Sequence, residues 1–245
     1  MSTLEDQITL SRLNQFPIES PYILTKPQRS TLTTRHELFS NIIKDFPEDL
    51  GKHASDTEIS TRDLGSIPDS TLTYGEIDFT SLGEIFETLK QRFNCLPSNG
   101  VFYDLGSGTG KGVIGAALLN PFDSCIGIEL LESLYNISNT MKSKLDELKP
   151  TIELDYAHVV DKIPQIEFIC GNIFEVNWTD ASLFLANSTC FSQSMMLQIA
   201  EVGVRPGTVA ISLSQRIPGP NWIMLESIKK AMSWGYATVN VQRRI

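Results

Sequence analysis

The sequence predicts an α/β fold, in which helices cover both faces of a mostly parallel β-sheet. The first observation is that apolar runs with strand character alternate with helical segments between residues 101 and 214. Such alternation is typical of parallel sheets, because each strand is joined to the next by a helix that packs on the sheet. The second is a glycine-rich turn, "GSGTGKG", which directly follows the apolar run "VFYDL". The third is the length of 245 residues, which allows one sizeable core and a small extra segment.

Residues 1–70 are predicted to form a small, mostly helical N-terminal segment that ends in a linker. Residues 34–46 have helical spacing of apolar side chains, and Thr34 with Glu37 offers a capping box. The chain before this helix should be broken into short pieces by its prolines, and the polar stretch 51–70 should form a long loop. The apolar residues are Leu38, Phe39, Ile42, Ile43 and Phe46, and the prolines are Pro17, Pro21 and Pro27.

The elements of the main domain follow in order along the chain. A helix is predicted over 74–93, because one face carries the apolar residues Leu82, Ile85, Phe86, Leu89 and Phe93. Strands are predicted at 101–105, 124–130, 165–171, 181–188 and 207–214. The intervening helices are predicted at 111–119, 131–149 and 192–203. The segment 221–235 fits either a helix or a strand that turns back into a strand at 237–242.

The composition argues against several classes of function. The formal net charge is −9, whereas proteins that bind nucleic acid through phosphate contacts normally have a basic surplus, so stable nucleic-acid binding is not expected. The four cysteines lie far apart and there are only three histidines, so no metal site is expected. No apolar run approaches the ~20 residues that cross a bilayer, and the N-terminus lacks the apolar core of a secretion signal. An intracellular protein is therefore expected, in the cytoplasm or the nucleus.

The glycine-rich turn carries the clearest functional signal. Gly106, Gly108 and Gly110 alternate strictly, and Asp104 stands two residues before the first of them. A Walker phosphate loop would need Ser or Thr after its lysine, where this chain has Gly112, and a dinucleotide fingerprint would place two residues between its second and third glycines. An acidic residue followed by G-x-G-x-G resembles motif I of the class I S-adenosylmethionine-dependent methyltransferases.

This resemblance implies S-adenosylmethionine as the cofactor and a Rossmann-like, seven-stranded sheet. A cofactor without phosphates needs a loop whose bare backbone its amino-acid moiety can approach, which glycine provides. Glu129 ends the second strand, where a carboxylate can accept hydrogen bonds from both ribose hydroxyls. Asn172, after the third strand, is placed for a contact with the adenine. The expected cofactor-binding residues are Tyr74, Glu76, Asp104, Gly106, Ser107, Gly108, Gly110, Lys111, Glu129, Asn172, Ile173 and Asn187.

Further segments narrow the resemblance. They are "TYGEI" before the helix that leads to the glycine loop, "LFLANSTCF" at the end of the fourth strand, and "SWGYATVNV" near the C-terminus. With the glycine loop they resemble the non-SET histone lysine methyltransferases of the disruptor-of-telomeric-silencing family. The resemblance covers roughly residues 71–245, which we expect to form the methyltransferase domain. Because the family's catalytic domain ends in a strand hairpin, 222–242 should form two antiparallel strands.

The family resemblance implies transfer of a methyl group to a protein lysine, with Tyr74, Asn187, Phe191 and Trp234 as the expected catalytic residues. Methyl transfer is an in-line displacement at a sulfonium carbon, so positioning is the main task. The amine must arrive neutral, which a narrow apolar channel favours because it desolvates the ammonium. Asn187 is expected to orient the acceptor nitrogen, Phe191 and Trp234 to wall the channel, and the loop with Tyr74 to fold over the cofactor.

The chain departs from the family pattern in several places. Ser188 replaces a second asparagine, Asn172 replaces the usual aspartate, and Lys111 replaces a neutral amide. Val239 and Val241 occupy the last strand, which lacks the family's channel tyrosine. These changes leave the glycine loop and Glu129 in place, and they affect the residues that would meet the acceptor.

Three functions stay open on the sequence alone. The first is a protein-lysine methyltransferase that acts on a basic protein, such as a free histone, because an acidic surface attracts basic partners. The second is a class I methyltransferase for RNA, a small molecule or another protein side chain. "ANSTCF" lacks the Asn/Asp-Pro-Pro-aromatic strand end often found in RNA base methylators. The third is a non-catalytic module that binds S-adenosylmethionine.

Overall fold

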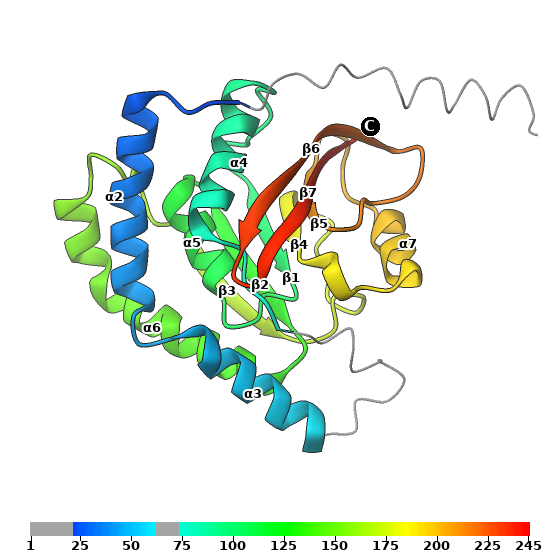
Figure 1. The fold of residues 1–245 in the computed structure, drawn as a ribbon, viewed down its shortest axis with the longest axis horizontal. Coiled ribbons are helices and arrows are strands. Elements are labelled where there is room, and N and C mark those ends of the chain that lie inside the picture. The colour runs from blue at the N-terminus through cyan, green and yellow to red at the C-terminus, as the bar shows by residue number, and fades with distance from the viewer. Residues whose placement is uncertain (1–21, 62–73) are drawn as a thin grey trace, which may run out of the picture.

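The computed structural model describes residues 22–61 and 74–245, which are built around a seven-stranded sheet (Figure 1). The order of the strands across the sheet is β3-β2-β1-β4-β5-β7-β6. β1 to β5 are parallel, whereas β7 is antiparallel to both of its neighbours, β5 and β6. The strands are β1 (Val101–Leu105), β2 (Ser124–Glu129), β3 (Gln165–Cys170), β4 (Ala181–Ala186), β5 (Val209–Leu213), β6 (Trp222–Met232) and β7 (Gly235–Arg244). The predicted Rossmann-like sheet with a C-terminal antiparallel hairpin is confirmed.

The register of the central strands gathers their carboxyl ends at one edge of the sheet. Leu105, the last residue of β1, pairs with Ile128 of β2 on one side and with Ala186 of β4 on the other. The loops that follow these three strands therefore emerge side by side. In open α/β sheets, this edge is where ligands bind.

Helices cover both faces of the sheet. They are α2 (Lys26–Ile43), α3 (Glu48–Thr61), α4 (Phe79–Gln91), α5 (Lys111–Leu119), α6 (Glu132–Asp155) and α7 (Gln193–Glu201), with a short 3₁₀ helix, η2 (Ser188–Cys190). Residues of α2, α4, α5 and α6 share one apolar core with the sheet, and α7 belongs to a second core on the other face. In the described part of the chain no helix has both the length and the apolar character needed to span a membrane.

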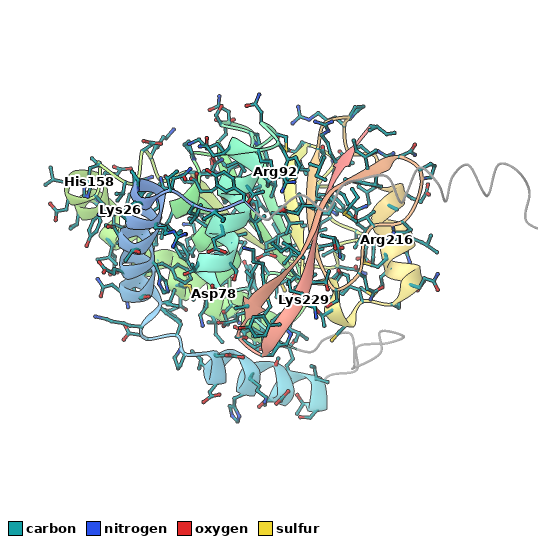
Figure 2. The ribbon with its side chains drawn as sticks, turned by 45° about the horizontal axis from the view of Figure 1, so that its top comes forward. Lys26, Asp78, Arg92, His158, Arg216 and Lys229 are labelled. Atoms are coloured by element: carbon teal, nitrogen blue, oxygen red, sulfur yellow. The ribbon has the colours of Figure 1, made fainter. Side chains whose placement is uncertain are left out.

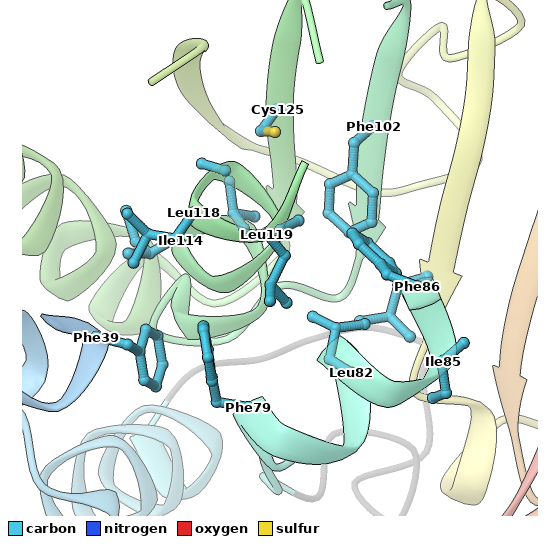
Figure 3. Close-up of a cluster of buried hydrophobic side chains, with 14 of the residues drawn as sticks. Phe39, Phe79, Leu82, Ile85, Phe86, Phe102, Ile114, Leu118, Leu119 and Cys125 are labelled. Atoms are coloured by element: carbon cyan, nitrogen blue, oxygen red, sulfur yellow. The ribbon is translucent and has the colours of Figure 1, made fainter. Parts of the chain in front are cut away.

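The larger core forms where α4 packs between the sheet and the N-terminal helix α2 (Figure 3). Phe79 stacks on Phe39 of α2, with ring centroids 4.6 Å apart, and Phe86 meets Phe102 of β1 edge to face. Asp78, which is labelled in Figure 2, caps α4, because its carboxylate accepts a hydrogen bond from the amide of Ser81. These contacts fix α4 in the position that leads the chain into β1.

The N-terminal helices differ from the prediction. The first helix begins at Lys26, so Pro27 stands in its first turn, where proline's missing N–H costs nothing. The predicted capping box at Thr34 is wrong, because Thr25 and Gln28 form the capping box instead. The prediction of a loop from residue 51 is also wrong as far as residue 61, since these residues belong to α3.

The wrong prediction for α3 has a physical cause. This helix has few apolar residues, and it is stabilised by packing on α6 rather than by an apolar stripe of its own. The rest of the predicted linker and the predicted domain boundary near residue 70 lie outside the described residues, as do Pro17 and Pro21. The ambiguous segment after residue 220 is the hairpin of β6 and β7.

Candidate active site

A cavity of about 770 Å³ lies at the carboxyl edge of the central strands. Ligand pockets commonly have volumes of 300–1,000 Å³. Its lining comes from the loops after β1, β2, β3 and β4, from the N-terminal part of α7, and from the Tyr74–Ile77 segment and Trp234. All of the predicted site residues line this cavity except Gly110.

The glycine loop after β1 forms the floor of the cavity. Gly106, Gly108 and Gly110 have φ angles of +81°, +56° and +87°, in the left-handed region that favours glycine. An added Cβ at Gly106 would meet only the tip of the Phe191 ring, at 3.9 Å, so the space above this residue is open. Gly110 is not among the residues that line the cavity: it precedes α5 and packs against Phe168 and Ser138, which leaves no room for a side chain.

Glu129 fixes the loop to the end of β2. One carboxylate oxygen accepts a hydrogen bond from the amide of Gly108 at 2.7 Å, and the other accepts from the amide of Leu131 at 2.9 Å. Burial raises the pKa of Glu129, and the backbone hydrogen bonds partly oppose that rise. The pKa of Asp104, at the end of β1, is also raised, first by burial and then by the nearby charge of Glu129. The cavity therefore has two neighbouring acidic groups on its floor.

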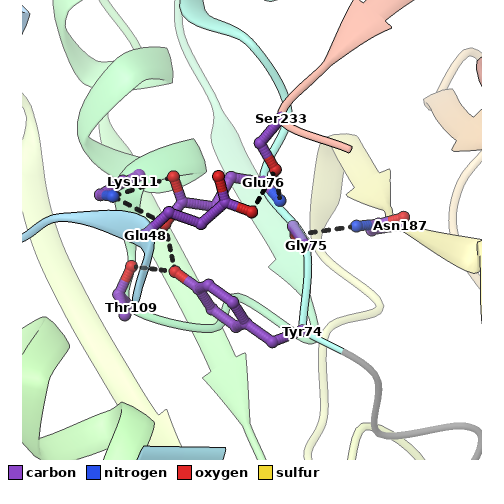
Figure 4. Close-up of polar contacts among 8 residues, drawn as sticks. All are labelled: Glu48, Tyr74, Gly75, Glu76, Thr109, Lys111, Asn187 and Ser233. Atoms are coloured by element: carbon purple, nitrogen blue, oxygen red, sulfur yellow. Dashed lines mark hydrogen bonds and ion pairs between the residues drawn. The ribbon is translucent and has the colours of Figure 1, made fainter. Parts of the chain in front are cut away.

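The Tyr-Gly-Glu segment covers the glycine loop from the side of α4 (Figure 4). The Tyr74 hydroxyl donates to the carboxylate of Glu76 and accepts from the Thr109 hydroxyl at 2.8 Å. Lys111 binds both oxygens of Glu76, at 2.7 and 2.9 Å. Burial, together with the charge of Glu76, raises the pKa of Tyr74. A lysine at a helix N-terminus is unfavourable by itself, and the carboxylate of Glu76 offsets its charge.

Asn187 and the hairpin turn hold the same segment from the other side. The amide nitrogen of Asn187 donates to the carbonyl of Gly75 at 3.0 Å (Figure 4). The Trp234 ring packs on Gly75, where an added Cβ would come within 2.5 Å of it. The amide of Ser233 donates to the carbonyl of Glu76 at 3.1 Å. Three segments that are distant in the sequence therefore meet at one wall of the cavity.

Two of the residues that depart from the family pattern form hydrogen bonds that stabilise the structure around them. Ser188 is fully buried, and its hydroxyl donates to the carbonyl of Leu213 at 2.7 Å, so it braces β5 and does not face the cavity. The side-chain oxygen of Asn172 accepts from the amide of Phe174 at 3.0 Å, and its nitrogen donates to Glu175 at 3.3 Å. Asn172 thus shapes the turn after β3 while it lines the cavity.

Several site residues escaped the sequence prediction. Met195 and Gln198 line the cavity from α7, and their spacing of three places them on one face of a helix that follows Asn187. That spacing is a signal that sequence reasoning can use. Thr109 bonds to Tyr74, and nothing in the sequence indicates this pairing or the one between Ser233 and Glu76.

The cavity suits the predicted cofactor. The hydroxyl of Ser107 is buried in the cavity wall and has no hydrogen-bond partner among the described residues. The open backbone at Gly106 can receive an amino-acid moiety, and Glu129 carries further lone pairs for hydroxyl donors. The described residues contain no group of three or more His, Cys, Asp or Glu placed to hold a metal ion.

One family and several solved structures match the chain. No curated protein matches the chain. An RNA methyltransferase from Salinibacter ruber, solved with S-adenosyl-L-homocysteine, is 21% identical over 65% of this chain and 90% of that chain, with a TM-score of 0.44. The rRNA methyltransferase aviRa from Streptomyces viridochromogenes is 15% identical over 75% of this chain and 95% of that chain, with a TM-score of 0.48. Residues 67–238 match the family described as "Histone methylation protein DOT1", which is more than half of the chain. The chain therefore belongs to the DOT1 family of histone methylation proteins and is an S-adenosylmethionine-dependent methyltransferase.

Proposed function

We propose that the protein transfers methyl groups to lysine side chains of a basic protein. The observation that carries the proposal is the character of one wall of the cavity, which η2, α7 and the hairpin turn contribute. Among the described residues, this wall consists of uncharged side chains: Thr189, Cys190, Phe191, Ser192, Ser194, Met195, Gln198 and Trp234. S-adenosylmethionine supplies an electrophilic methyl group when it is bound.

An uncharged wall favours the neutral form of an approaching amine. Desolvation lowers the pKa of a lysine ammonium, and no carboxylate on this wall stabilises the charged form. A neutral amine has the lone pair that methyl transfer requires. Family membership supports the same acceptor, since the family is described as one of histone methylation proteins.

Asn187 is the residue best placed to orient that amine. The amide nitrogen of Asn187 donates to the Gly75 carbonyl, so the side-chain oxygen of Asn187 is the atom that can accept from the substrate. That oxygen accepts from the Thr189 hydroxyl at 3.2 Å and has a second lone pair for an N–H of the substrate. The net charge of −9 favours a basic protein as the partner.

The proposal is tested by incubating the protein with S-adenosylmethionine carrying a labelled methyl group and with three acceptors: free histones, tRNA, and bovine albumin as an acidic control. We expect label in the histones, recovered as methyl-lysine after acid hydrolysis. Asn187→Ala should reduce this transfer by about 100-fold, because the amine loses its orienting acceptor. Its affinity for S-adenosylhomocysteine should fall by a smaller factor, about tenfold, because the Gly75 carbonyl also loses its hydrogen-bond donor.

The matched control is Asn136→Ala, which removes the same side chain from an exposed position on α6. It should leave both transfer and affinity unchanged. Label in tRNA without methyl-lysine in the histones would overturn the lysine assignment. Full activity of Asn187→Ala would remove Asn187 from the mechanism.

A further inference from the structure

Helix α3 contacts the active site although it lies outside the residues that match the family. None of its residues lines the cavity. Yet it touches three segments that do: Tyr74, the start of α6, and the turn between β6 and β7. We propose that α3 is a positioning element of the methyltransferase site, which holds the Tyr74 ring against the glycine loop and so keeps the cofactor cavity formed. This inference requires the cofactor site and does not depend on which acceptor is methylated.

The Tyr74 ring lies between two glycines. An added Cβ at Gly51 of α3 would overlap the Tyr74 ring and come within 2.6 Å of its hydroxyl. On the other side, an added Cβ at Gly108 would come within 2.9 Å of the same ring. The space between the helix and the loop therefore fits one aromatic ring and nothing more.

Helix propensity makes Gly51 an unexpected residue at this place. It lies inside α3 and is buried, and its φ is not in the left-handed region, so its backbone conformation does not require glycine. Alanine would stabilise a helix more than glycine does. The reason for glycine is the room that its missing side chain leaves for Tyr74.

Glu58 fixes the other end of α3 to α6. No side chain of α6's own first turn caps it, since its N-cap is Leu131. The carboxylate of Glu58 accepts from the amides of Glu132, at 3.1 Å, and Ser133, at 2.7 Å. The hydroxyl of Ser133 donates to the Ala54 carbonyl at 3.2 Å, and Figure 1 shows α3 beside the start of α6. This attachment lies next to Leu131, which lines the cavity.

Glu48 fixes the first turn of α3 to the hairpin. The Ser233 hydroxyl donates to the Glu48 carboxylate at 2.9 Å and accepts from the amide of Glu76 at 3.2 Å (Figure 4). The helix thus joins the Tyr-Gly-Glu segment, the hairpin turn and α6. A helix that is attached through Glu48 and Glu58 can hold Tyr74 in place through Gly51, which lies between them.

The experiment measures affinity for S-adenosylhomocysteine by titration calorimetry in Gly51→Ala. We expect a loss of about tenfold or more, because the methyl group displaces Tyr74 from the loop. In a Tyr74→Ala background the same substitution should cause no further loss, since no ring is left to displace. A role in overall stability alone would give additive losses. Gly203→Ala is the matched control, because an added Cβ there meets nothing within 4 Å, and it should bind as the parent does.

Glu58→Ala tests the proposal without crowding Tyr74. It should lower the same affinity several-fold by detaching α3 from α6, whereas Asp56→Ala, at an exposed position of the same helix, should not. This variant decides the question if Gly51→Ala does not fold. Parental affinity in Glu58→Ala, or additive losses in the Gly51→Ala and Tyr74→Ala pair, would overturn the proposal.

Discussion

The two sides of the cavity are built in different ways. The strand side, made of residues 104–112 and Glu129, sits at the ends of β1 and β2 and is fixed mainly by backbone hydrogen bonds. The loop side consists of residues 74–77, Asn187 and residues 233–234, which are far apart in the sequence. It is assembled largely through side chains, such as the Asn187 amide on Gly75 and the Trp234 ring beside it.

The two sides should therefore differ in how well they tolerate substitutions. On the strand side, the backbone of a buried sheet sets the geometry, so most side chains matter only where they enter the cavity. On the loop side, each contact depends on one side chain, and a single substitution can release a whole segment. The three predictions that follow test this contrast.

The largest effect is expected from Gly108→Arg, which places a long side chain in the glycine loop of the strand side. Residue 108 has a positive φ, and even a Cβ there would press on Tyr74. Affinity for S-adenosylhomocysteine should fall by more than about 1,000-fold, to the limit of calorimetry. Gly203→Arg, at a position with open space, is the control for the added charge and should bind normally. Measurable binding by Gly108→Arg at similar affinity would mean that the ligand lies elsewhere.

A smaller effect is expected at Lys111, whose ion pair with Glu76 bridges the two sides. Only 7% of the Lys111 side chain and 15% of the Glu76 side chain are exposed. Lys111→Gln leaves the carboxylate buried without its cation, so the free energy of unfolding should fall by about 3 kcal/mol. The double variant with Glu76→Gln should recover part of this loss in urea denaturation.

The control for this pair lies on the surface of α6. Lys142 pairs with Asp146 one turn along the helix, with 32% and 53% of the side chains exposed. Lys142→Gln should change the free energy of unfolding by no more than about 0.5 kcal/mol. Equal losses in Lys111→Gln and Lys142→Gln would show that the bridge between the two sides contributes little.

The smallest effect is a gain in stability on the strand side. The pKa of Asp104 in the folded protein is raised above its ordinary value of 3.8, so the folded state holds this proton to higher pH than the unfolded state. Stability therefore falls as pH rises from that ordinary value through the folded pKa. Asp104→Asn removes this fall, and its thermal midpoint should exceed that of the parent by a margin that grows with pH.

The gain should come with weaker cofactor binding, because Asp104 lines the cavity. Thermal unfolding from pH 5 to pH 8 measures the first effect, and titration with S-adenosylhomocysteine measures the second. Asp56→Asn removes a carboxylate from an exposed position and serves as the control. Parallel curves for Asp104→Asn and the parent would contradict the assignment of the raised pKa.

The strand side is also the part that sequence alone predicted best. β1 and α5 begin and end at the predicted residues, because an apolar run followed by alternating glycines determines both the strand and the turn locally. The cavity contains Glu129 and Asn187 because the ends of parallel strands meet at one edge. The binding and catalytic roles given to these residues stay predictions that the experiments above address.

The loop side could not be predicted in the same way. Its contacts join residues that are distant in the sequence. Tyr74 packs on Gly51, Asn187 donates to Gly75, and Glu58 accepts from the first amides of α6. The spacing of apolar residues along the chain does not predict such contacts. The part of α3 from residue 51 was predicted to be a loop for the same reason, since its polar sequence becomes a helix only where α6 is available to pack against it.

The position of β7 inside the sheet has a consequence for how the protein is made. β7 pairs with β5 on one side and β6 on the other, and the turn before it carries Ser233 and Trp234. On the ribosome, β1 to β5 emerge first and can pair with one another before the hairpin exists. Glu76 is synthesised 157 residues before its hydrogen-bond partner Ser233, so this contact can form only after the hairpin has been made. We therefore expect the active site to form late in folding, when the hairpin of β6 and β7 docks, and we expect this step to appear as a slow phase in refolding.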